Sequence, residues 1–322
     1  MKITMSHGSG GMETAELIET VFINHFRNEF TSTDDAVILP FGNESLIFTT
    51  DSFVVDPLFF PGGDIGRLAV CGTVNDLLTT GGESLYLSAS FILEENLDSS
   101  VLESIAMSMR KAADEAGVRI VTGDTKVIEG SGGLYITTAG VGISGSIRLC
   151  VAHGDSILIS GNLGDHHACI MSARMGIRNN IKSDVAPLTE MVNALTKSGI
   201  PVHGLRDITR GGLATVLNEI TNVTGLQADI FETALPLSEE VDGLCKILGL
   251  DLLYMGNEGK MLAIVPKEFA IEALNIMKNS RYCENATIVG CFTEGTGVVL
   301  NTKIGGQRRL PVLSGEGLPR IC

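Results

Sequence analysis

Long hydrophobic runs are absent from this sequence, and their absence excludes a membrane-spanning protein. None of the apolar stretches in its 322 residues approaches the roughly 20 residues that a helix needs to cross a bilayer. The opening residues Met1 to Thr4 run directly into a glycine-rich segment and lack the hydrophobic region of a secretory signal peptide. We therefore expect no membrane segment and no export.

Grouped cysteines are also missing. The seven cysteines are scattered without a CxxC or CxxH spacing, which indicates neither a disulfide framework nor a structural zinc site. This pattern favours a reducing, cytoplasmic location. Because cysteine is among the most frequently buried residue types, we expect core packing for Cys71, Cys150, Cys169, Cys245, Cys283 and Cys291.

Positive charge is scarce. The 23 lysines and arginines stand against 38 aspartates and glutamates, which gives a net charge of -15. This balance disfavours nucleic acid and anionic membranes as partners, because phosphate backbones demand a basic surface. Nucleotides remain compatible with it, since a few carboxylates can hold magnesium against phosphate oxygens.

The order of helical and strand patterns indicates the fold class. A chain of 322 residues, 44% hydrophobic and 19% charged, suits two compact domains. Periodicity predicts helices over residues 12–27, 64–79, 99–116, 165–175, 188–197, 212–222, 238–248 and 267–278. It predicts strands over residues 46–50, 118–122, 134–143, 156–160, 227–231, 261–265, 287–291 and 298–300. We infer two α/β domains in series, over residues 1–150 and 151–304, followed by a flexible tail over residues 305–322. The first helix carries an expected apolar face of Ile18, Phe22, His25 and Phe26.

A glycine cluster precedes the first predicted helix. In His7–Gly11, the residues Gly8, Ser9, Gly10 and Gly11 allow backbone N–H groups to wrap a phosphate at a helix N-terminus. The cluster is neither a Walker P-loop nor a dinucleotide fingerprint, because it lacks Gly-Lys-Ser/Thr and no strand precedes it. A plain flexible leader is the alternative interpretation.

Polar residues of the first half form a candidate magnesium–nucleotide site. The set comprises Asp34, Asp35, Asp51, Asn75, Asp76 and Asp124. Carboxylates from several strand ends and turns can converge to supply the oxygen ligands that magnesium prefers. The pair Asn75-Asp76 lies inside an apolar helical segment, where buried polar groups need a partner such as a metal ion. Any single acid is more simply a cap or a turn residue, but the four positions Asp34-Asp35, Asp51, Asp76 and Asp124 together favour a shared site.

Two residues are candidates for moving protons. Lys126, two positions after Asp124, could contact the same phosphates or act as an acid–base group, although a lysine after a strand is usually solvated. Glu258 stands between Asn257 and Gly259 on a tight turn before a strand. It is a candidate general base, and a simple turn residue is an equally good interpretation.

A second candidate anion-binding segment lies at the start of the helix predicted from residue 212. Here a glycine pair, Gly211 and Gly212, follows two arginines and an aspartate: Arg206, Asp207 and Arg210. Charged donors and free backbone N–H groups at a helix start make a plausible anion cradle.

The last residue, Cys322, ends a stretch rich in flexible and polar residues, with Pro311 and Pro319 stiffening it locally. An exposed free thiol is an oxidation liability that most sequences avoid. We therefore expect a swinging thiol arm that carries a substrate to the site, and an incidental terminal cysteine is the alternative.

Taken together, these motifs carry a family resemblance that runs essentially end to end. The motifs are His7–Gly11, the segment from Thr50 through Pro61–Asp64 to Asp76, Gly123–Lys126, Arg206–Gly212 and Pro319–Cys322. They resemble the HypE family, the hydrogenase maturation factors of the aminoimidazole-ribotide-synthetase-like ATPase superfamily. The terminal Pro-Arg-Ile-Cys is the most specific of them, because other superfamily members lack this thiol tail.

The resemblance implies a two-domain fold whose N-terminal domain strands form a barrel shared by a homodimer. It implies an ATP- and Mg²⁺-dependent enzyme that dehydrates a carbamoyl group on Cys322 to a thiocyanate. The implied partners are the carbamoyltransferase HypF and the HypC–HypD scaffold, which receives the cyano group on the iron of a [NiFe]-hydrogenase cofactor. The implied magnesium ligands are Asp51, Asp76 and Asp124, with Asp34, Asp35, Asn75 and Asp207 as further candidates. Lys126 and Glu258 are the implied groups for moving the amide proton.

Three other functions remain open. A small-molecule kinase of the same superfamily would not need Cys322. A metallochaperone that carries iron or nickel on Cys322 would bind metal without ATP turnover and would leave the acidic and glycine clusters unexplained. An interaction module would use the tail only as a docking peptide.

Overall fold

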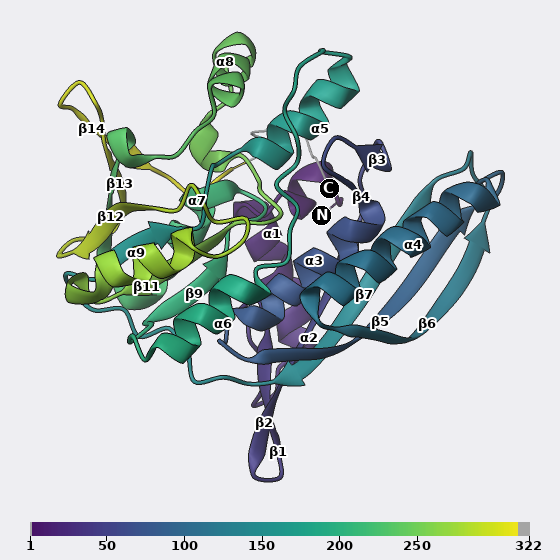
Figure 1. Cartoon of the computed structure of the whole chain (residues 1–322), viewed down its shortest axis with the longest axis horizontal. Coiled ribbons are helices and arrows are strands. Elements are labelled where there is room, and N and C mark those ends of the chain that lie inside the picture. Colours follow the sequence, from purple (N-terminus) through teal and green to yellow (C-terminus); the bar gives the residue numbers. More distant parts are fainter. Residues whose placement is uncertain (1, 315–322) are drawn as a thin grey trace.

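Two β-sheets with their helices make up the computed structural model, which describes residues 2–314. Figure 1 shows the sheet of the N-terminal half on one side of the molecule and the sheet of the C-terminal half on the other, with α3 between them. The predicted alternation of helices and strands is confirmed. Among residues 2–314, no helix is both long and apolar enough to cross a membrane.

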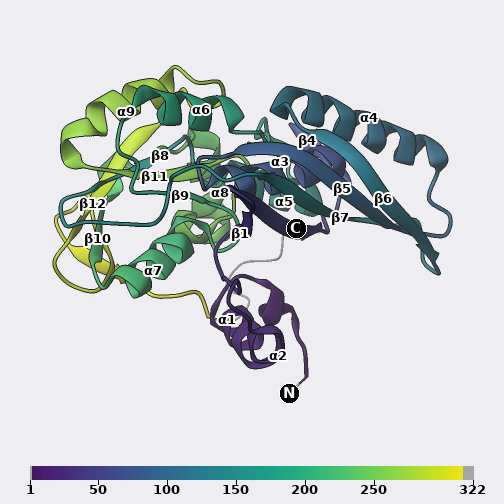
Figure 2. The ribbon, with the colours of Figure 1, turned by 90° about the horizontal axis from the view of Figure 1, so that it is seen from below.

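The first sheet has five strands in the order β1-β2-β7-β5-β6. Its strands are β1 (Val37–Phe41), β2 (Glu44–Phe53), β5 (Glu83–Glu94), β6 (Arg119–Ile128) and β7 (Leu134–Ile143). Only β5 and β6 run parallel; the other neighbours are antiparallel. Helices α3 (Ile65–Leu78) and α4 (Ser99–Ala116) lie against one face of this sheet (Figure 2). The short pair β3 (Phe59–Phe60) and β4 (Gly63–Asp64) precedes α3.

Helix α3 joins the two halves of the molecule. Asp64 caps its start by accepting hydrogen bonds from the N–H groups of Gly66 (2.8 Å) and Arg67 (3.0 Å). The helix is apolar on nearly all sides, and 12 of its 14 residues are buried, as expected of a helix inside a core. It packs on β2 and β7 of the first sheet and on helix α6 (Thr189–Ser198) and strand β9 (Gly204–Asp207) of the second half.

The second sheet has seven strands in the order β14-β13-β10-β12-β8-β11-β9. Its remaining strands are β8 (Ser156–Ile159), β10 (Gln227–Phe231), β11 (Met261–Val265), β12 (Thr287–Thr293), β13 (Gly297–Asn301) and β14 (Gln307–Leu310). Successive residues of β8 belong to two different cores, since Leu158 lies in the core that includes α3, while Ile157 and Ile159 lie in the core that includes α7. Such two-sided burial explains why its sequence is continuously apolar.

The helices of the second half lie on both faces of this sheet. They are α5 (Asp165–Met175), α6, α7 (Gly212–Thr224), α8 (Glu239–Leu248) and α9 (Ala270–Lys278), with 3-10 turns at Glu232–Ala234, Leu252–Tyr254 and Lys267–Phe269. Helix α7 covers one face, and α9, which contacts α6, covers the other. Figure 2 shows α9 and α6 on one side of these strands and α7 on the other.

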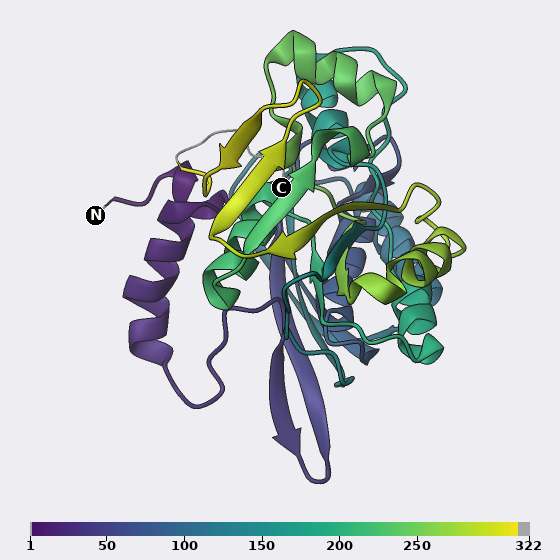
Figure 3. The same cartoon turned by 90° about the vertical axis from the view of Figure 1, so that its left-hand side faces the viewer.

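The predicted N-terminal helix forms, but its apolar face is not buried within the chain. After a 3-10 turn at Met5–Gly8, the helix runs through α1 (Met12–Leu17), a π-helical segment (Ile18–Ile23) and α2 (Asn24–Phe26). Phe22 is 46% exposed and Phe26 is 67% exposed. Figures 2 and 3 show this helix standing apart from both sheets. The apolar face predicted for this helix is therefore largely exposed in the single chain.

Six strands were not predicted from the sequence, and one of them lies in the C-terminal tail. The missed strands are β1, β3, β4, β5, β9 and β14. Strand β14 lies in the range expected to be flexible and pairs with β13 from Gln307 to Leu310. The carboxyl of Asp251 accepts a 2.7 Å hydrogen bond from Arg308. The chain therefore stays in the second sheet as far as residue 310, and Cys322 lies outside the described residues.

Candidate active site

Four acidic side chains from distant parts of the sequence meet between the two halves. Asp51 (β2), Asp76 (α3), Asp207 (β9) and Glu258 line a small cavity of about 20 Å³ together with Arg210. We call these five residues the acidic cluster. Their elements adjoin one another because α3 packs on β2 on one side and on β9 on the other.

Strand register orients Asp51, and a hydrogen bond from the Thr49 hydroxyl holds Asp76; these two residues are the members of the acidic cluster from the first half of the chain. Asp51 pairs across the sheet with Thr138, whose hydroxyl bonds to the carbonyl of Ala69 on α3 at 3.1 Å. Because paired residues of neighbouring strands point to the same face, Asp51 faces α3. Thr49, two residues earlier on that face, donates a 3.1 Å hydrogen bond to Asp76.

Burial and mutual repulsion make the cluster costly to ionise. Burial is the main cause that raises the pKa of Asp76 well above its usual range, and repulsion from Asp207, Asp35 and Asp51 adds to it. Burial likewise raises the pKa of Asp207 to about 8, with repulsion from Asp35 adding and Arg206 opposing. The pKa of Asp51 is raised by burial and lowered again in part by Arg210, whose Nη2 lies 3.8 Å from the Asp51 Oδ1.

This cluster fits magnesium–nucleotide binding by its chemistry. A cation would remove the repulsion that raises these pKa values. Within residues 2–314, no three His, Cys, Asp or Glu side chains are close enough together to form a complete metal cage. Magnesium, however, commonly takes only one or two carboxylates and completes its shell with water and phosphate oxygens. Asp51, Asp76 and Asp207 can provide such ligands.

Asp35 and Asp34, the two adjacent candidates, have different surroundings. Asp35 is largely buried and forms an ion pair with the Arg206 Nε at 2.7 Å. Arg206 also donates a 2.7 Å hydrogen bond to Glu219. Asp34 is exposed and accepts a 2.9 Å hydrogen bond from Ser32. Asp35 therefore adjoins the cluster as the partner of Arg206, while Asp34 stays in a surface turn.

Asn75 has backbone partners on both sides of its side chain. Its Nδ2 donates to the Ala186 carbonyl at 3.0 Å, and its Oδ1 accepts from the Leu188 N–H at 2.9 Å. The expectation that this buried amide needs a metal partner is thus corrected, because the segment at 186–188 satisfies it. We expect Asn75→Ala to lower the free energy of unfolding by about 2–4 kcal/mol, because two buried backbone groups lose their partners.

Chemical denaturation of Asn75→Ala beside wild type checks this prediction. Asn24→Ala is the control, since Asn24 is exposed and its replacement should cost about 0.5 kcal/mol or less. Unchanged stability of Asn75→Ala combined with weaker ATP binding would instead favour a direct cofactor contact.

The single chain does not bring Asp124 and Lys126 to the acidic cluster. Asp51, Thr138, Ala89 and Gly123 form one row across the sheet, so the neighbouring Asp124 points to the opposite face. Three strand spacings, or about 14 Å, also separate β2 from β6. The Lys126 Nζ donates to the Asp124 Oδ2 at 2.6 Å, and this bond lowers the pKa of the Asp124 carboxyl.

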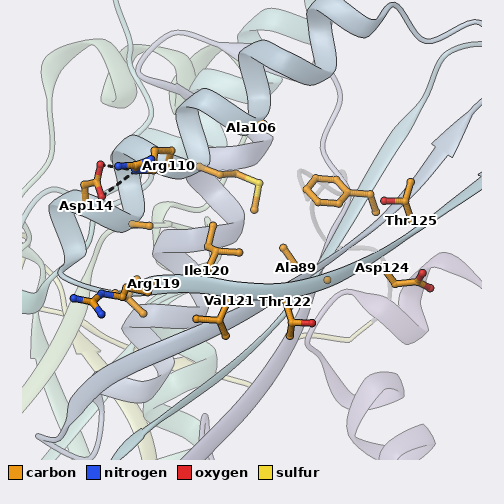
Figure 4. Close-up of a pocket in the computed structure, with 15 residues that line it drawn as sticks. Ala89, Ala106, Arg110, Asp114, Arg119, Ile120, Val121, Thr122, Asp124 and Thr125 are labelled. Atoms are coloured by element: carbon orange, nitrogen blue, oxygen red, sulfur yellow. Dashed lines mark hydrogen bonds and ion pairs between the residues drawn. The ribbon is translucent and has the colours of Figure 1, made fainter.

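Asp124 instead borders a larger cavity. This cavity of about 870 Å³ lies between α4 and the strands β5 and β6. Figure 4 shows Ala106 and Arg110 on the helix side, Ile120 and Thr122 on the strand side, and Asp124 away from the Arg110–Asp114 pair. Its lining contains none of the acidic cluster. The predicted metal role of Asp124 and the predicted proton-transfer role of Lys126 stay predictions.

The glycine pair at the start of α7 has a clear conformational reason. Gly211 and Gly212 have φ of +76° and +64°, a region that favours glycine. A Cβ on Gly212 would lie 2.6 Å from the Leu253 carbonyl oxygen. The pair allows the chain to turn sharply after Arg210, and this turn directs Arg210 towards Asp51. The role of the glycine pair as an anion cradle stays a prediction.

The first glycine cluster lies beside the same arginine. A Cβ on Gly10, whose φ is +80°, would lie 3.2 Å from the Arg210 Cβ. Gly8 closes the 3-10 turn, and the Ser9 hydroxyl donates to the Ser6 carbonyl at 2.8 Å. A Cβ on Gly11 would lie 2.4 Å from the Leu313 carbonyl oxygen. The cluster is thus near the acidic cluster, and its phosphate contacts stay a prediction.

Asp184 is a supporting residue that the sequence analysis missed. Its side chain is buried, and its Oδ1 accepts a 3.2 Å hydrogen bond from the Glu258 N–H. Its Oδ2 lies 3.6 Å from the Lys260 Nζ. A Cβ on Gly259 would lie 2.0 Å from the Asp184 carbonyl oxygen, so this turn tolerates only glycine there. Asp184 and Glu258 are 74 residues apart, and no local pattern signals such a contact.

Comparisons with known proteins identify the family of this chain. The AIR synthase related proteins match in both parts, with their N-terminal domain over residues 33–144 and their C-terminal domain over residues 152–303. The carbamoyl dehydratase HypE of Rhodobacter capsulatus is 44% identical, covering 100% of this chain and 98% of its own. The chain belongs to the HypE family of carbamoyl dehydratases.

Solved structures of HypE proteins have the same fold. The crystal structure of a HypE in complex with ATP has a TM-score of 0.84 at 43% identity and covers 100% of both chains. The HypE of a HypE–HypF complex has a TM-score of 0.87 at 44% identity, covering 92% of this chain and 99% of that one. The predicted α/β fold of the superfamily is therefore confirmed. The predicted division at residues 150 and 304 stays a prediction.

Proposed function

We propose that this HypE family member uses ATP to dehydrate a carbamoyl group carried on Cys322. The product is a protein thiocyanate whose cyano group is donated to iron during [NiFe]-hydrogenase maturation. The acidic cluster carries the proposal, because it places the candidate base Glu258 in one small cavity with Asp51, Asp76, Asp207 and Arg210. Relatives named carbamoyl dehydratase HypE and a HypE crystallised with ATP support it.

The reaction balances in two steps. First, the carbamoyl oxygen attacks the γ-phosphorus of ATP, ADP leaves, and one N–H proton is lost, which gives an O-phosphorylated imidate on sulfur. Then the C–O bond breaks, phosphate leaves, and the second N–H proton is lost as the C≡N bond forms. The oxygen and the two protons that the carbamoyl group loses are the elements of one water, and ATP is consumed to ADP and phosphate as they are removed. Phosphorylation is needed because it converts a very poor leaving group into phosphate.

The chain's own residues have definite tasks in these steps. Glu258, held by Asp184, accepts an N–H proton of the amide. Arg210, beside Asp51, lies where it can bind a phosphate oxygen. Asp51, Asp76 and Asp207 would hold Mg²⁺, which neutralises charge on the phosphates when it is bound. The low exposure of Asp207 (7%) and Glu258 (6%) keeps bulk water away from the intermediate.

We further propose a homodimer that pairs through the first sheet. Every residue of β6 is exposed in the single chain, including Val121 and Val127, which are 59% and 65% exposed. A long exposed apolar edge strand normally has a partner. Lys126 and Asp124 lie on that strand, so they would face the second copy. The HypE–HypF complex supports HypF as the carbamoyl donor, and we propose HypC–HypD as the cyano acceptor.

Intact-mass measurement tests the proposed function. The protein is incubated with a HypF-type carbamoyltransferase, carbamoyl phosphate and Mg-ATP. We expect an adduct equal to a carbamoyl group less one water. Omitting ATP should leave the heavier carbamoyl adduct. No adduct, together with ATP-dependent phosphorylation of an added small molecule, would contradict the proposal and favour a small-molecule kinase.

A further inference from the structure

The chain leaves the second sheet along a path that is held at successive carbonyl groups. The Leu310 carbonyl accepts a 3.0 Å hydrogen bond from the Asn218 Nδ2. The Pro311 carbonyl accepts one of 2.7 Å from the Tyr254 hydroxyl. The Leu313 carbonyl accepts one of 2.9 Å from the Met12 N–H. The last of these contacts joins the C-terminal segment to the N-terminal helix.

Gly11 makes the contact at Leu313 possible. A Cβ at residue 11 would lie 2.4 Å from the Leu313 oxygen, which is closer than real Cβ atoms approach, and 3.1 Å from its carbonyl carbon. The φ of Gly11 is -99°, a conformation that any residue adopts. Its lack of a side chain is therefore required by the approach of Leu313 and not by backbone strain.

The contact lies beside the acidic cluster. Gly10, the preceding residue, packs on the Cβ of Arg210, and the Arg210 guanidinium is 3.8 Å from Asp51. Cys322 is nine residues beyond Leu313. A fully extended segment of that length spans at most about 30 Å. A fixed starting point next to the cluster therefore limits where the thiol can go.

We propose that Gly11 and Met12 are positioning residues that hold the start of the C-terminal arm, at Leu313, against the N-terminal helix. We call this contact the dock. The inference rests on the proposed function, in which Cys322 carries the substrate. The dock raises the effective concentration of the arm at its own chain's cluster, because the arm starts there instead of at Pro311. The Met12 N–H is occupied by Leu313, so in this arrangement it binds the arm and not a phosphate.

Two substitutions remove the dock in different ways. Met12→Pro deletes the donor at the first position of α1, where proline is tolerated. Gly11→Ala adds the Cβ that displaces Leu313. We expect each to slow conversion of the thiocarbamate to the thiocyanate about fivefold or more. Met12→Pro should leave the Kd for ATP within about twofold.

Matched variants are the controls. Met12→Ala keeps the N–H and removes only a side chain that is 55% exposed. Gly243→Ala adds a Cβ that has no atom within 4 Å. Both should convert the thiocarbamate at the wild-type rate. Wild-type conversion by Met12→Pro and Gly11→Ala would overturn the dock. A parallel loss of ATP affinity in Met12→Pro would overturn it too and restore the phosphate-binding interpretation.

Hydrogen exchange at the Met12 amide separates this inference from the proposed function. The amide should be protected in the full-length wild type and should exchange at least about tenfold faster in Gly11→Ala. This readout does not require turnover. Protection with no thiocyanate in the wild type would contradict the proposed function alone, whereas an unprotected Met12 amide in the wild type would contradict the dock.

Discussion

Replacing Cys322 by alanine should abolish the carbamoyl and cyano adducts while ATP still binds. A thioester-like link to carbamoyl needs a nucleophilic sulfur, and alanine has none. The Kd for ATP should stay within a few-fold of the wild type, because the proposed phosphate contacts come from the acidic cluster and not from the arm. Intact mass and equilibrium binding measure the two effects.

The surroundings of the other cysteines make Cys322 the expected carrier. Burial raises the pKa of Cys71 and Cys283 to about 12, and that of Cys169 and Cys245 to about 11. These four thiols are buried and stay protonated near neutral pH, so they are poor nucleophiles. Cys291 is half-buried, and burial also raises its pKa.

Cys150 is the matched control. The core packing expected for Cys150 is wrong, because it is the exposed cysteine among residues 2–314. It is therefore the best competing nucleophile. Cys150→Ala should form both adducts at the wild-type rate. An adduct that persists in Cys322→Ala and disappears in Cys150→Ala would overturn the arm mechanism.

Local patterns predicted most elements of this fold, because most helices have one buried face. Helix α4, predicted at residues 99–116, has those bounds, and its buried residues Ile105, Met109 and Ala112 recur at helical spacing. The missed strand β5 lies in a segment whose alternation is broken by a register shift between Ser84 and Tyr86. Strand β14 is short and polar, and three of its four residues are exposed.

The candidate site was predictable only in part, since its geometry depends on contacts between distant residues. Asp51, Asp76, Asp207 and Glu258 were each recognisable from a turn or an unusual polar position, and they do meet. Asn75 had the same signal, yet its partners are the carbonyl of Ala186 and the N–H of Leu188. A sequence alone does not distinguish a buried amide that binds backbone from one that binds a cofactor.

Strand direction explains the position of Asp124 and Lys126. The sequence predicted a strand ending at residue 122, which would place Asp124 in a loop free to turn towards Asp51. The strand continues instead to Ile128. It pairs with β5 in a fixed register, so alternation directs both side chains away from α3.

Glu258→Gln should stop the reaction at the thiocarbamate. Glutamine preserves the shape of the side chain but cannot accept the N–H proton. We expect conversion to the thiocyanate to fall by about 10²–10⁴-fold, the usual contribution of a positioned general base. Loading of Cys322 by the carbamoyltransferase should be unaffected, so the intact mass should show the carbamoyl adduct accumulating in the presence of Mg-ATP.

A slower reaction of Glu258→Gln can be assigned to the lost proton acceptor, because the backbone around residue 258 is held in place. Its N–H is fixed by Asp184, and the adjoining Gly259 packs on the Asp184 carbonyl, so glutamine should occupy the same position. Glu240→Gln is the control, because Glu240 is exposed on α8 and should leave the rate unchanged. Conversion by Glu258→Gln at the wild-type rate would assign the proton transfer elsewhere. Lys126 of a second copy would then be the next candidate, since β6 presents it on the exposed side of the sheet.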